Sequence, residues 1–107
     1  MYTRVVELTS KPGKSKELAN TINEKVLPIL KKQHGFIDEA VFVSETKADQ
    51  VLGLSFWNTK EDAELYRQEH FPKIHESLKH LLNDEPIVRT FEVHTSTIHQ
   101  IAAGKAA

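Results

Sequence analysis

The order of two apolar periodicities along the chain most constrains its fold. Four short segments are rich in β-branched and aromatic residues or alternate apolar with polar ones, which is typical of strands. Between the first and second segments, and again between the third and fourth, apolar residues recur at helical spacing. Strands are predicted at residues 2–9, 36–45, 51–57 and 87–96, and helical regions at 14–34 and 58–82. This βαββαβ order predicts an α+β ferredoxin-like domain with an antiparallel four-stranded sheet.

Proline, glycine and short polar residues set the expected ends of the helices. Pro28 should kink or interrupt the first helix, because proline lacks an N–H and its ring clashes with the preceding turn. Gly35 is expected to cap the same helix. Asn58, with Glu61 three residues later, resembles a capping box at the start of the second helical region. That region must stop or bend before Pro72.

The chain of 107 residues has room for one domain. A ferredoxin-like domain is expected at residues 1–98. Residues 99–107 are expected to form a C-terminal tail, since Ile101 to Ala107 are mostly small residues that offer little to a core.

The charge balance and the absent residue types exclude several classes of protein. The 14 basic and 15 acidic side chains give a net charge of −1, which provides no broad basic face for nucleic acid. The chain has no cysteine, so disulfides, thiolate nucleophiles and cysteine-based zinc motifs are excluded. No apolar run approaches the ~20 residues of a membrane span, and no apolar signal segment opens the chain. We expect a cytoplasmic protein with neither nucleic-acid nor membrane partners.

Apolar residues occur on both faces of the predicted sheet. In the third strand Leu52, Leu54 and Phe56 alternate with Val51 and Trp57. A sheet with one face in solvent alternates apolar and polar residues more cleanly. Because the helices cover one face only, the other carries apolar surface typical of an interface. We therefore expect a homodimer joined through the sheet faces. The alternatives are a C-terminal tail folded across the uncovered face and a few exposed apolar residues that are simply tolerated.

Several short motifs resemble one known family over about residues 2–95. They are Pro12-Gly13-Lys14 before a helix, Pro28 late in it, Gly35-Phe36 entering a strand, Phe56-Trp57 closing the next strand, Ala63 just after, and His75 on the second helical region. At these positions the chain resembles the antibiotic biosynthesis monooxygenase family. The resemblance implies two ferredoxin-like subunits packed sheet to sheet, a dimeric α/β barrel, with a pocket between the sheet and the helices of each subunit.

The wider superfamily includes quinone-forming monooxygenases without metal or flavin, heme-degrading monooxygenases, isomerase-like lactone enzymes and proteins of no known activity. In the heme-degrading branch a histidine on the second helical region ligates iron, and His75 holds the matching place. The resemblance implies two further heme residues, a tryptophan and an asparagine. Tyr66 stands at the tryptophan position, and Arg4 or Val5 at the asparagine position. Heme binding is therefore an alternative to a protein without a cofactor.

A metal site made by histidines of the second helical region is not expected. His70, His75 and His80 follow one another at intervals of five residues. Five residues turn a helix by about 140°, so these side chains do not share one face. Pro72 also separates the first two.

The chemistry of cofactor-free oxygenation selects the candidate site residues. It requires a base poised near neutral pH and a hydrogen-bond donor for a developing oxyanion, in a pocket that excludes water. Histidine suits the first role, because its unperturbed pKa lies near 6.5. The candidate catalytic residues are His75, Tyr66 and His70, and the candidate substrate-binding residues are Arg4, Phe56 and Trp57.

Each candidate also has a structural explanation. His75 is equally expected to be a partly buried histidine hydrogen-bonded where helix and sheet meet. Trp57, at a strand end, is more often a core residue than a stacking surface. Arg4 could form an ion pair with Glu7 or Glu92 across the sheet.

These observations favour a small-molecule pocket protein, a cofactor-independent monooxygenase-like enzyme acting on a small aromatic or polyketide-like compound. The alternatives are a non-catalytic ligand-binding or stress-associated dimer and a divergent heme-binding or heme-degrading monooxygenase. The enzyme predicts an enclosed, mostly apolar pocket reached by Tyr66, His70 or His75. A filled or very shallow cavity would favour the non-catalytic dimer.

Overall fold

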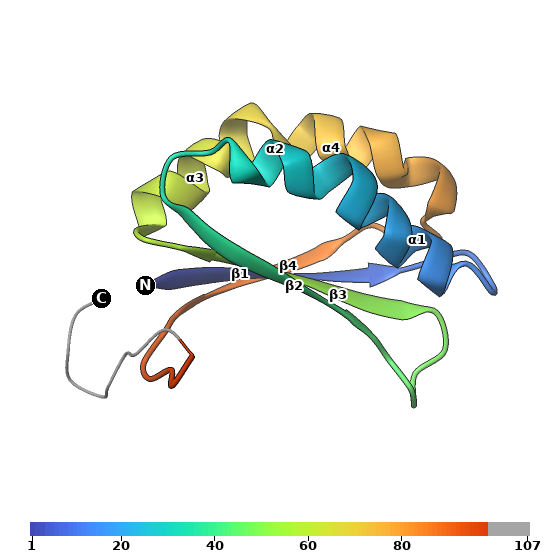
Figure 1. Cartoon of the computed structure of the whole chain (residues 1–107). Helices are drawn as coiled ribbons and strands as arrows, with labels where there is room; N and C mark the ends of the chain where they lie inside the picture. The colour runs from blue at the N-terminus through green and yellow to red at the C-terminus, as the bar shows by residue number, and fades with distance from the viewer. Residues whose placement is uncertain (99–107) are drawn as a thin grey trace.

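The fold is a four-stranded antiparallel sheet with all of the helices on one face (Figure 1). The computed structural model describes residues 1–98. The strands are β1 (Tyr2–Thr9), β2 (Phe36–Val43), β3 (Gln50–Trp57) and β4 (Ile87–Glu92), in the spatial order β2-β3-β1-β4. The helices are α1 (Ser15–Thr21), α2 (Leu27–Lys31), α3 (Lys60–Glu69) and α4 (Phe71–Leu78). The predicted α+β ferredoxin-like fold is confirmed, with the second and fourth strands shorter than expected.

Pro28 interrupts the first helical region as predicted. Between α1 and α2 the chain forms a π-helical segment, Ile22–Val26, and Pro28 lies in the first turn of α2. Proline has no N–H for the carbonyl four residues earlier, and its ring clashes with that carbonyl. The widened turn accommodates this, and the Leu27 N–H bonds to the carbonyl of Ile22, five residues back.

The second helical region divides before Pro72, also as predicted. His70 has a non-helical backbone between α3 and α4, and Pro72 lies in the first turn of α4. A 3₁₀ segment, Lys79–Leu81, then leads toward β4. The break lets α4 change direction, which places its apolar side over the sheet.

Two predicted caps are wrong in detail. The N-cap of α3 is Thr59 rather than Asn58, and Thr59 Oγ1 accepts a hydrogen bond from the Asp62 N–H. The first helical region ends at Lys31 with Lys32 as its C-cap. Gly35 lies beyond that end with φ +79°, in the turn that enters β2. A β-carbon on Gly35 would clash with the Asp62 side chain, so the close approach of α3 also requires glycine here.

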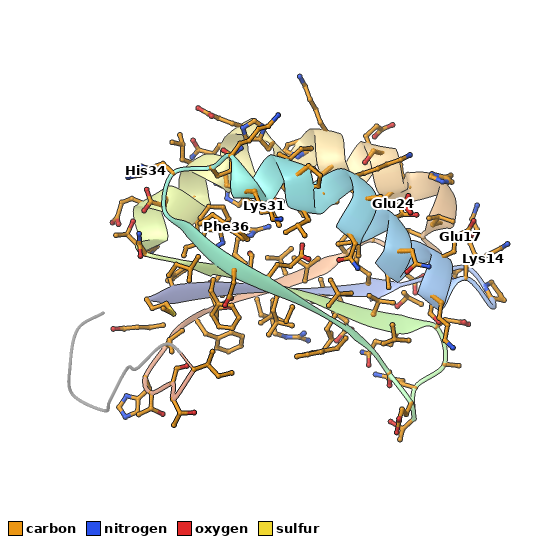
Figure 2. The ribbon with its side chains drawn as sticks, in the orientation of Figure 1. Lys14, Glu17, Glu24, Lys31, His34 and Phe36 are labelled. Atoms are coloured by element: carbon orange, nitrogen blue, oxygen red, sulfur yellow. The ribbon has the colours of Figure 1, made fainter. Side chains whose placement is uncertain are left out.

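The core lies between the sheet and the helices, where Figure 2 shows side chains filling the layer. Its most completely buried members are Leu18 from α1, Val51 and Trp57 from β3, and Ala63 from α3. The charged side chains of Lys14, Glu17 and Glu24 are exposed on the outer side of the first helical region (Figure 2). This division is the amphipathic pattern that the helical spacing predicted.

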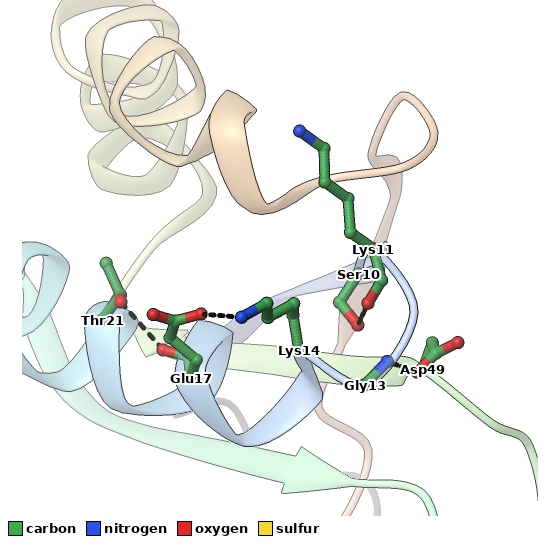
Figure 3. Close-up of polar contacts among 7 residues, drawn as sticks. All are labelled: Ser10, Lys11, Gly13, Lys14, Glu17, Thr21 and Asp49. Atoms are coloured by element: carbon green, nitrogen blue, oxygen red, sulfur yellow. Dashed lines mark hydrogen bonds and ion pairs between the residues drawn. The ribbon is translucent and has the colours of Figure 1, made fainter.

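A set of polar contacts fixes the turn between β1 and α1 to the β2–β3 loop (Figure 3). The Gly13 N–H donates to Asp49 Oδ1 at 3.1 Å, and the Ser10 N–H donates to the Asp49 carbonyl at 2.8 Å. Asp49 itself has φ +66°, a conformation that aspartate tolerates in turns. These contacts hold the entry to α1 at the end of the central strands β1 and β3.

The uncovered face of the sheet is apolar near its centre and edges. The register places Thr3, Val5 and Glu7 on this face beside Leu52, Leu54 and Phe56. Phe42, Ile87 and Phe91 extend the same face on β2 and β4, and each is about half exposed. The alternative cover, the tail at residues 99–107, lies outside the described residues. Residues 1–98 leave this face open.

Across residues 1–98, no helix combines the length and apolar character needed to cross a membrane.

Candidate functional site

A cavity of about 60 Å³ lies between the sheet and the helices. Side chains from β1, β2, β3, the first helical region and α4 line it, and most of them are aliphatic. The polar and charged residues in its lining are Arg4, Glu39, Ser55, Tyr66 and His75. At roughly 15 Å³ per water, this volume has room for about four water molecules.

The strand register explains how three of these residues come together. Arg4 on β1 is opposite Ser55 on β3, and Ser55 is opposite Glu39 on β2. Residues opposite each other in adjacent strands have side chains on the same face. One row across the sheet therefore presents a guanidinium, a hydroxyl and a carboxyl to the helices. Adjacent strands are ~4.8 Å apart, so the backbones of Arg4 and Glu39 are about 10 Å apart.

Arg4 is buried without a hydrogen-bonding partner. The residue is 2% exposed, and neither Nη1 nor Nη2 has a partner. Its guanidinium carbon lies 4.8 Å from the centre of the Phe71 ring and 5.7 Å from that of Tyr66. Burial lowers the pKa of Arg4, since desolvation disfavours the charged form.

The two carboxylates suggested as partners of Arg4 are elsewhere. Glu7 is on the open face, where Oε1 accepts from Arg89 Nη1 at 3.5 Å. Glu92 is opposite Tyr2 at the sheet edge and is exposed. Within residues 1–98, neither forms an ion pair with Arg4. The structural explanation of Arg4 is therefore wrong.

Tyr66 extends from α3 toward Arg4 and is 5% exposed. Its ring packs against that of Trp57 with centroids 5.1 Å apart. Burial raises the pKa of Tyr66 to about 12, an effect partly opposed by the nearby charge of Arg4. The phenol therefore keeps its proton at neutral pH and is available as a hydrogen-bond donor.

His75 lies on α4 and lines the cavity. Its ring stacks on Phe71 with centroids 6.4 Å apart, and its Nε2 lies 3.4 Å from Glu85 Oε2. The carboxylate can orient the imidazole ring. His75 therefore lines the cavity and also contacts an exposed carboxylate at the surface.

The other three candidates lie outside the cavity lining. His70 stacks on Tyr66 from the outer side with centroids 6.3 Å apart. Trp57 is fully buried, and its Nε1 donates to Ser55 Oγ at 2.9 Å. Phe56 faces away from the helices, on the open face of the sheet. The structure therefore brings together Arg4, Tyr66 and His75 in the cavity lining. The rings of His70 and Trp57 pack against the Tyr66 ring.

Glu39 and Ser55 were not among the predicted site residues. Burial raises the pKa of Glu39, partly offset by the charge of Lys31. A signal was present in the sequence, since Glu39 alternates with Val41 and Val43 and so shares their face of β2. An acidic side chain on a face that otherwise packs against helices is a candidate cavity residue.

The comparison with known families assigns the chain to one of them. The model of the antibiotic biosynthesis monooxygenase family matches residues 1–77, which include three strands and almost all of the helical residues. The chain belongs to the antibiotic biosynthesis monooxygenase family. A search of curated protein sequences found no match.

Solved structures share the fold of this family member at low sequence identity. A conserved protein from Methanosarcina mazei is 22% identical with a TM-score of 0.70, and the alignment covers 86% of this chain and 92% of that one. The monooxygenase from the gene ActVA-Orf6 of Streptomyces coelicolor, solved with nanaomycin D, is 15% identical with a TM-score of 0.75, covering 89% and 88%. SnoaB, a cofactor-independent oxygenase from Streptomyces nogalater, is 14% identical with a TM-score of 0.74, covering 90% and 95%.

The residues of this family member do not fit a heme. A heme could enter a cavity of about 60 Å³ only after several of the side chains that line it move outward. His75 Nε2 faces Glu85, and the position expected to hold asparagine carries the buried Arg4. In the described part of the chain, no cluster of histidine, aspartate and glutamate could hold a metal ion.

Proposed function

We propose that this protein is a homodimeric, cofactor-independent monooxygenase that acts on a small aromatic or polyketide-like compound. The observation that carries the proposal is the apolar cavity, into whose lining the fold brings a cation, a phenol and an imidazole. The family of the chain supports this reading, as does the fold shared with a cofactor-independent oxygenase.

The proposed reaction begins with removal of the phenolic proton of the substrate. His75 takes the proton, and Glu85, 3.4 Å from its Nε2, stabilises the imidazolium that forms. The aromatic oxyanion is electron-rich at its ring carbons, one of which forms a bond to dioxygen, and His75 returns its proton to the peroxide anion that results. Loss of water from the resulting hydroperoxide gives a quinone. For a phenol with a free para position, one phenol and one O₂ give one quinone and one water.

Two residues stabilise the developing negative charge in this scheme. Tyr66 keeps its proton because burial raises its pKa to about 12, so it can donate a hydrogen bond to an oxyanion. Arg4 supplies positive charge in a water-poor layer, where such charge acts strongly. The rings of His70 and Trp57 pack against the Tyr66 ring, so both are positioning residues in this proposal. Phe56 belongs to the dimer interface.

Oxygen uptake with phenols and anthrones tests the activity. Wild type is incubated with 1-naphthol or anthrone under ¹⁸O₂, and the product is analysed by mass spectrometry. We expect one ¹⁸O per quinone and a loss of at least about 100-fold in rate for His75→Ala, the usual effect of removing a general base. His80→Ala is the matched control, because His80 is exposed and outside the cavity lining. A wild-type rate no faster than that of His75→Ala would reject the activity.

The open face of the sheet supports the homodimer. Phe42, Ile87 and Phe91 are exposed apolar side chains on this face, and exposed apolar surface is typical of interfaces. Light scattering on a sizing column should give twice the chain mass of 12.2 kDa for wild type. Phe91→Glu should give monomer, whereas Leu65→Glu should remain dimeric. Leu65 is a matched control because both side chains are 50% exposed, but Leu65 lies on α3. A monomeric wild type would reject the dimer.

The size of the cavity favours a second candidate, a non-catalytic ligand-binding dimer. A volume of about 60 Å³ holds only a compact ligand unless Phe71 or His75 moves outward. Saturable ligand binding without ¹⁸O incorporation from any phenol or anthrone would support this candidate over the enzyme.

A further inference from the structure

Arg4 is a buried cation whose terminal nitrogens have no hydrogen-bond acceptor among residues 1–98. Its neighbours are the faces of Phe71 and Tyr66, which attract a cation but accept no ordinary hydrogen bond. Nη1 and Nη2 both lack a partner. A guanidinium has five N–H donors, and leaving them unpaired in a buried layer is unfavourable. Packing does not account for this choice of residue, since an aliphatic side chain of similar length would fill the same space.

The acidic groups near Arg4 are either engaged or too distant to serve as its partner. Glu64 acts on the charge of Arg4, but its Oε2 accepts from Arg67 Nε and Nη2, each at 3.0 Å. Glu39 lines the same cavity, two strands away from Arg4 in the sheet register. Burial raises the pKa of Glu39, and the charge that offsets this effect is Lys31 rather than Arg4. The cavity thus holds an uncompensated positive site beside aliphatic walls.

We propose that Arg4 is the anion-recognising residue of this cavity, and that the ligand is an oxyanion carried on a compact apolar body. The inference rests on the proposed function, because it names the ligand class of the same cavity. A carboxylate or an aromatic oxyanion would accept hydrogen bonds from Nη1 and Nη2, and a carboxylate can accept both at once. The aliphatic lining would surround the hydrocarbon part of the ligand.

Access to the guanidinium depends on Phe71. The terminal nitrogens are covered, and Phe71 lies directly over them at the first position of α4, after the break at His70. Phe71 is only partly buried, so its ring can turn outward toward solvent and open the cavity. A ligand that displaces the ring would replace a cation–π contact with charge-assisted hydrogen bonds, which are stronger.

Isothermal titration calorimetry on the full chain tests this inference. The probes are benzoate and phenylacetate as carboxylates, 1-naphthol as an aromatic oxyanion precursor, benzamide as a neutral analogue, and sulfate as an anion without an apolar body. We expect saturable binding of at least one carboxylate or of 1-naphthol to wild type. Benzamide and sulfate should each bind at least tenfold more weakly than the best probe. Comparing the affinities of the carboxylates with that of 1-naphthol shows whether the oxyanion is a carboxylate or an aromatic oxyanion.

Variants of Arg4 identify the group responsible. Arg4→Met should weaken binding of the best probe at least tenfold, and Arg4→Lys should recover part of it, because lysine keeps the charge but loses the paired donors. Arg4→Gln is a second variant should Arg4→Met fail to give a cooperative melt. Lys16→Met is the matched control, since Lys16 is an exposed cation on α1, outside the cavity lining and away from the open face of the sheet. Equal binding by Arg4→Met or Arg4→Gln, equal binding of benzamide, or no binding of any probe would overturn the inference.

The two proposals fail separately in these experiments. Arg4-dependent binding without oxygen incorporation would retain the anion site and reject the monooxygenase. Oxygenation of 1-naphthol that depends on His75, with an unchanged KM in Arg4→Met, would retain the monooxygenase and reject Arg4 as the anion-recognising residue.

Discussion

The guanidinium of Arg4 lies 4.8 Å from the centre of the Phe71 ring, and this aromatic face replaces the acceptor that a buried arginine normally has. The contact joins the central strand β1 to the first residue of α4. A ring face compensates a buried charge only in part. Arg4 therefore lowers the stability of the protein without ligand, while it supplies the positive charge proposed to bind the ligand.

Arg4→Met should therefore stabilise the protein without ligand. Replacing buried charged groups by apolar ones of similar volume often stabilises by 1–4 kcal/mol, and the lost cation–π contacts offset about 1 kcal/mol of that gain. We expect the free energy of unfolding to rise by up to about 3 kcal/mol in urea titrations. Lys16→Met, at an exposed position on α1, should change it by less than ~0.5 kcal/mol. A less stable Arg4→Met protein would mean that Arg4 has a structural partner.

Gly53→Val should fill the cavity while preserving the fold. A β-carbon at Gly53 meets no atom within 4 Å, and Gly53 lines the cavity from β3. Valine favours strands, and replacing a strand glycine gains roughly 0.5–1 kcal/mol. We expect unchanged or raised stability in thermal melts together with lost ligand binding and oxygenation. Gly53→Ala should give an intermediate loss, and full activity of Gly53→Val would place the site elsewhere.

Glu39 should make the stability of the protein depend on pH. Burial raises the pKa of its carboxyl above the ordinary value of 4.5, so the folded chain holds this proton more tightly than the unfolded chain. The contribution is favourable below pH 4.5 and is lost as the pH rises through the folded pKa. Glu39→Gln should therefore exceed wild type in stability at pH 7, and the difference should shrink toward pH 4.5. Urea titrations across this range measure it.

Glu24→Gln provides the control for that experiment, because Glu24 is exposed on the outer side of the first helical region. A Glu39→Gln difference that does not vary between pH 4.5 and 7 would contradict the prediction.

Ser55→Ala should lower the free energy of unfolding, because it removes the acceptor of the buried indole N–H of Trp57. Ser55 Oγ accepts from Trp57 Nε1 at 2.9 Å, and Trp57 is fully buried. Without the hydroxyl, the indole N–H has no acceptor, at a cost of about 1–3 kcal/mol in unfolding free energy. Denaturation followed by the fluorescence of this single tryptophan measures the loss. Ser77→Ala is the control, since Ser77 is exposed and water can replace its bond to the Ile74 carbonyl.

Thr59→Ala distinguishes the observed helix cap from the predicted one. Thr59 Oγ1 accepts from the Asp62 N–H at 3.1 Å, and its hydroxyl donates to Asp62 Oδ2 at 2.9 Å. Loss of an N-cap residue costs about 1 kcal/mol. Asn58→Ala should change stability by less than ~0.5 kcal/mol, because Asn58 contacts Gly35 through its backbone N–H. Equal losses in the two variants would contradict this assignment.

The sequence by itself determined the fold, through local signals that act over a few residues. The order of strand and helix periodicities gave βαββαβ, and Pro28 and Pro72 marked the two helix interruptions, because a missing N–H acts wherever the ring lies. The alternation within β3 separated Trp57 from Phe56 before their surroundings were known. The exact cap residue is harder to predict from local signals: the sequence predicts Asn58, whereas Thr59 is the cap in the structure.

Only the tertiary structure decided which side chains share the cavity. The row of Glu39, Ser55 and Arg4 depends on the register of three strands, and one residue of slippage would send each side chain to the opposite face. The bulge between Phe36 and Asp38 helps to set that register in β2. The same register directs Glu7 to Arg89 on the open face and places the Arg4 guanidinium against the rings of Phe71 and Tyr66. Sequence spacing carries no such information, because pairing between strands is a long-range property of the folded chain.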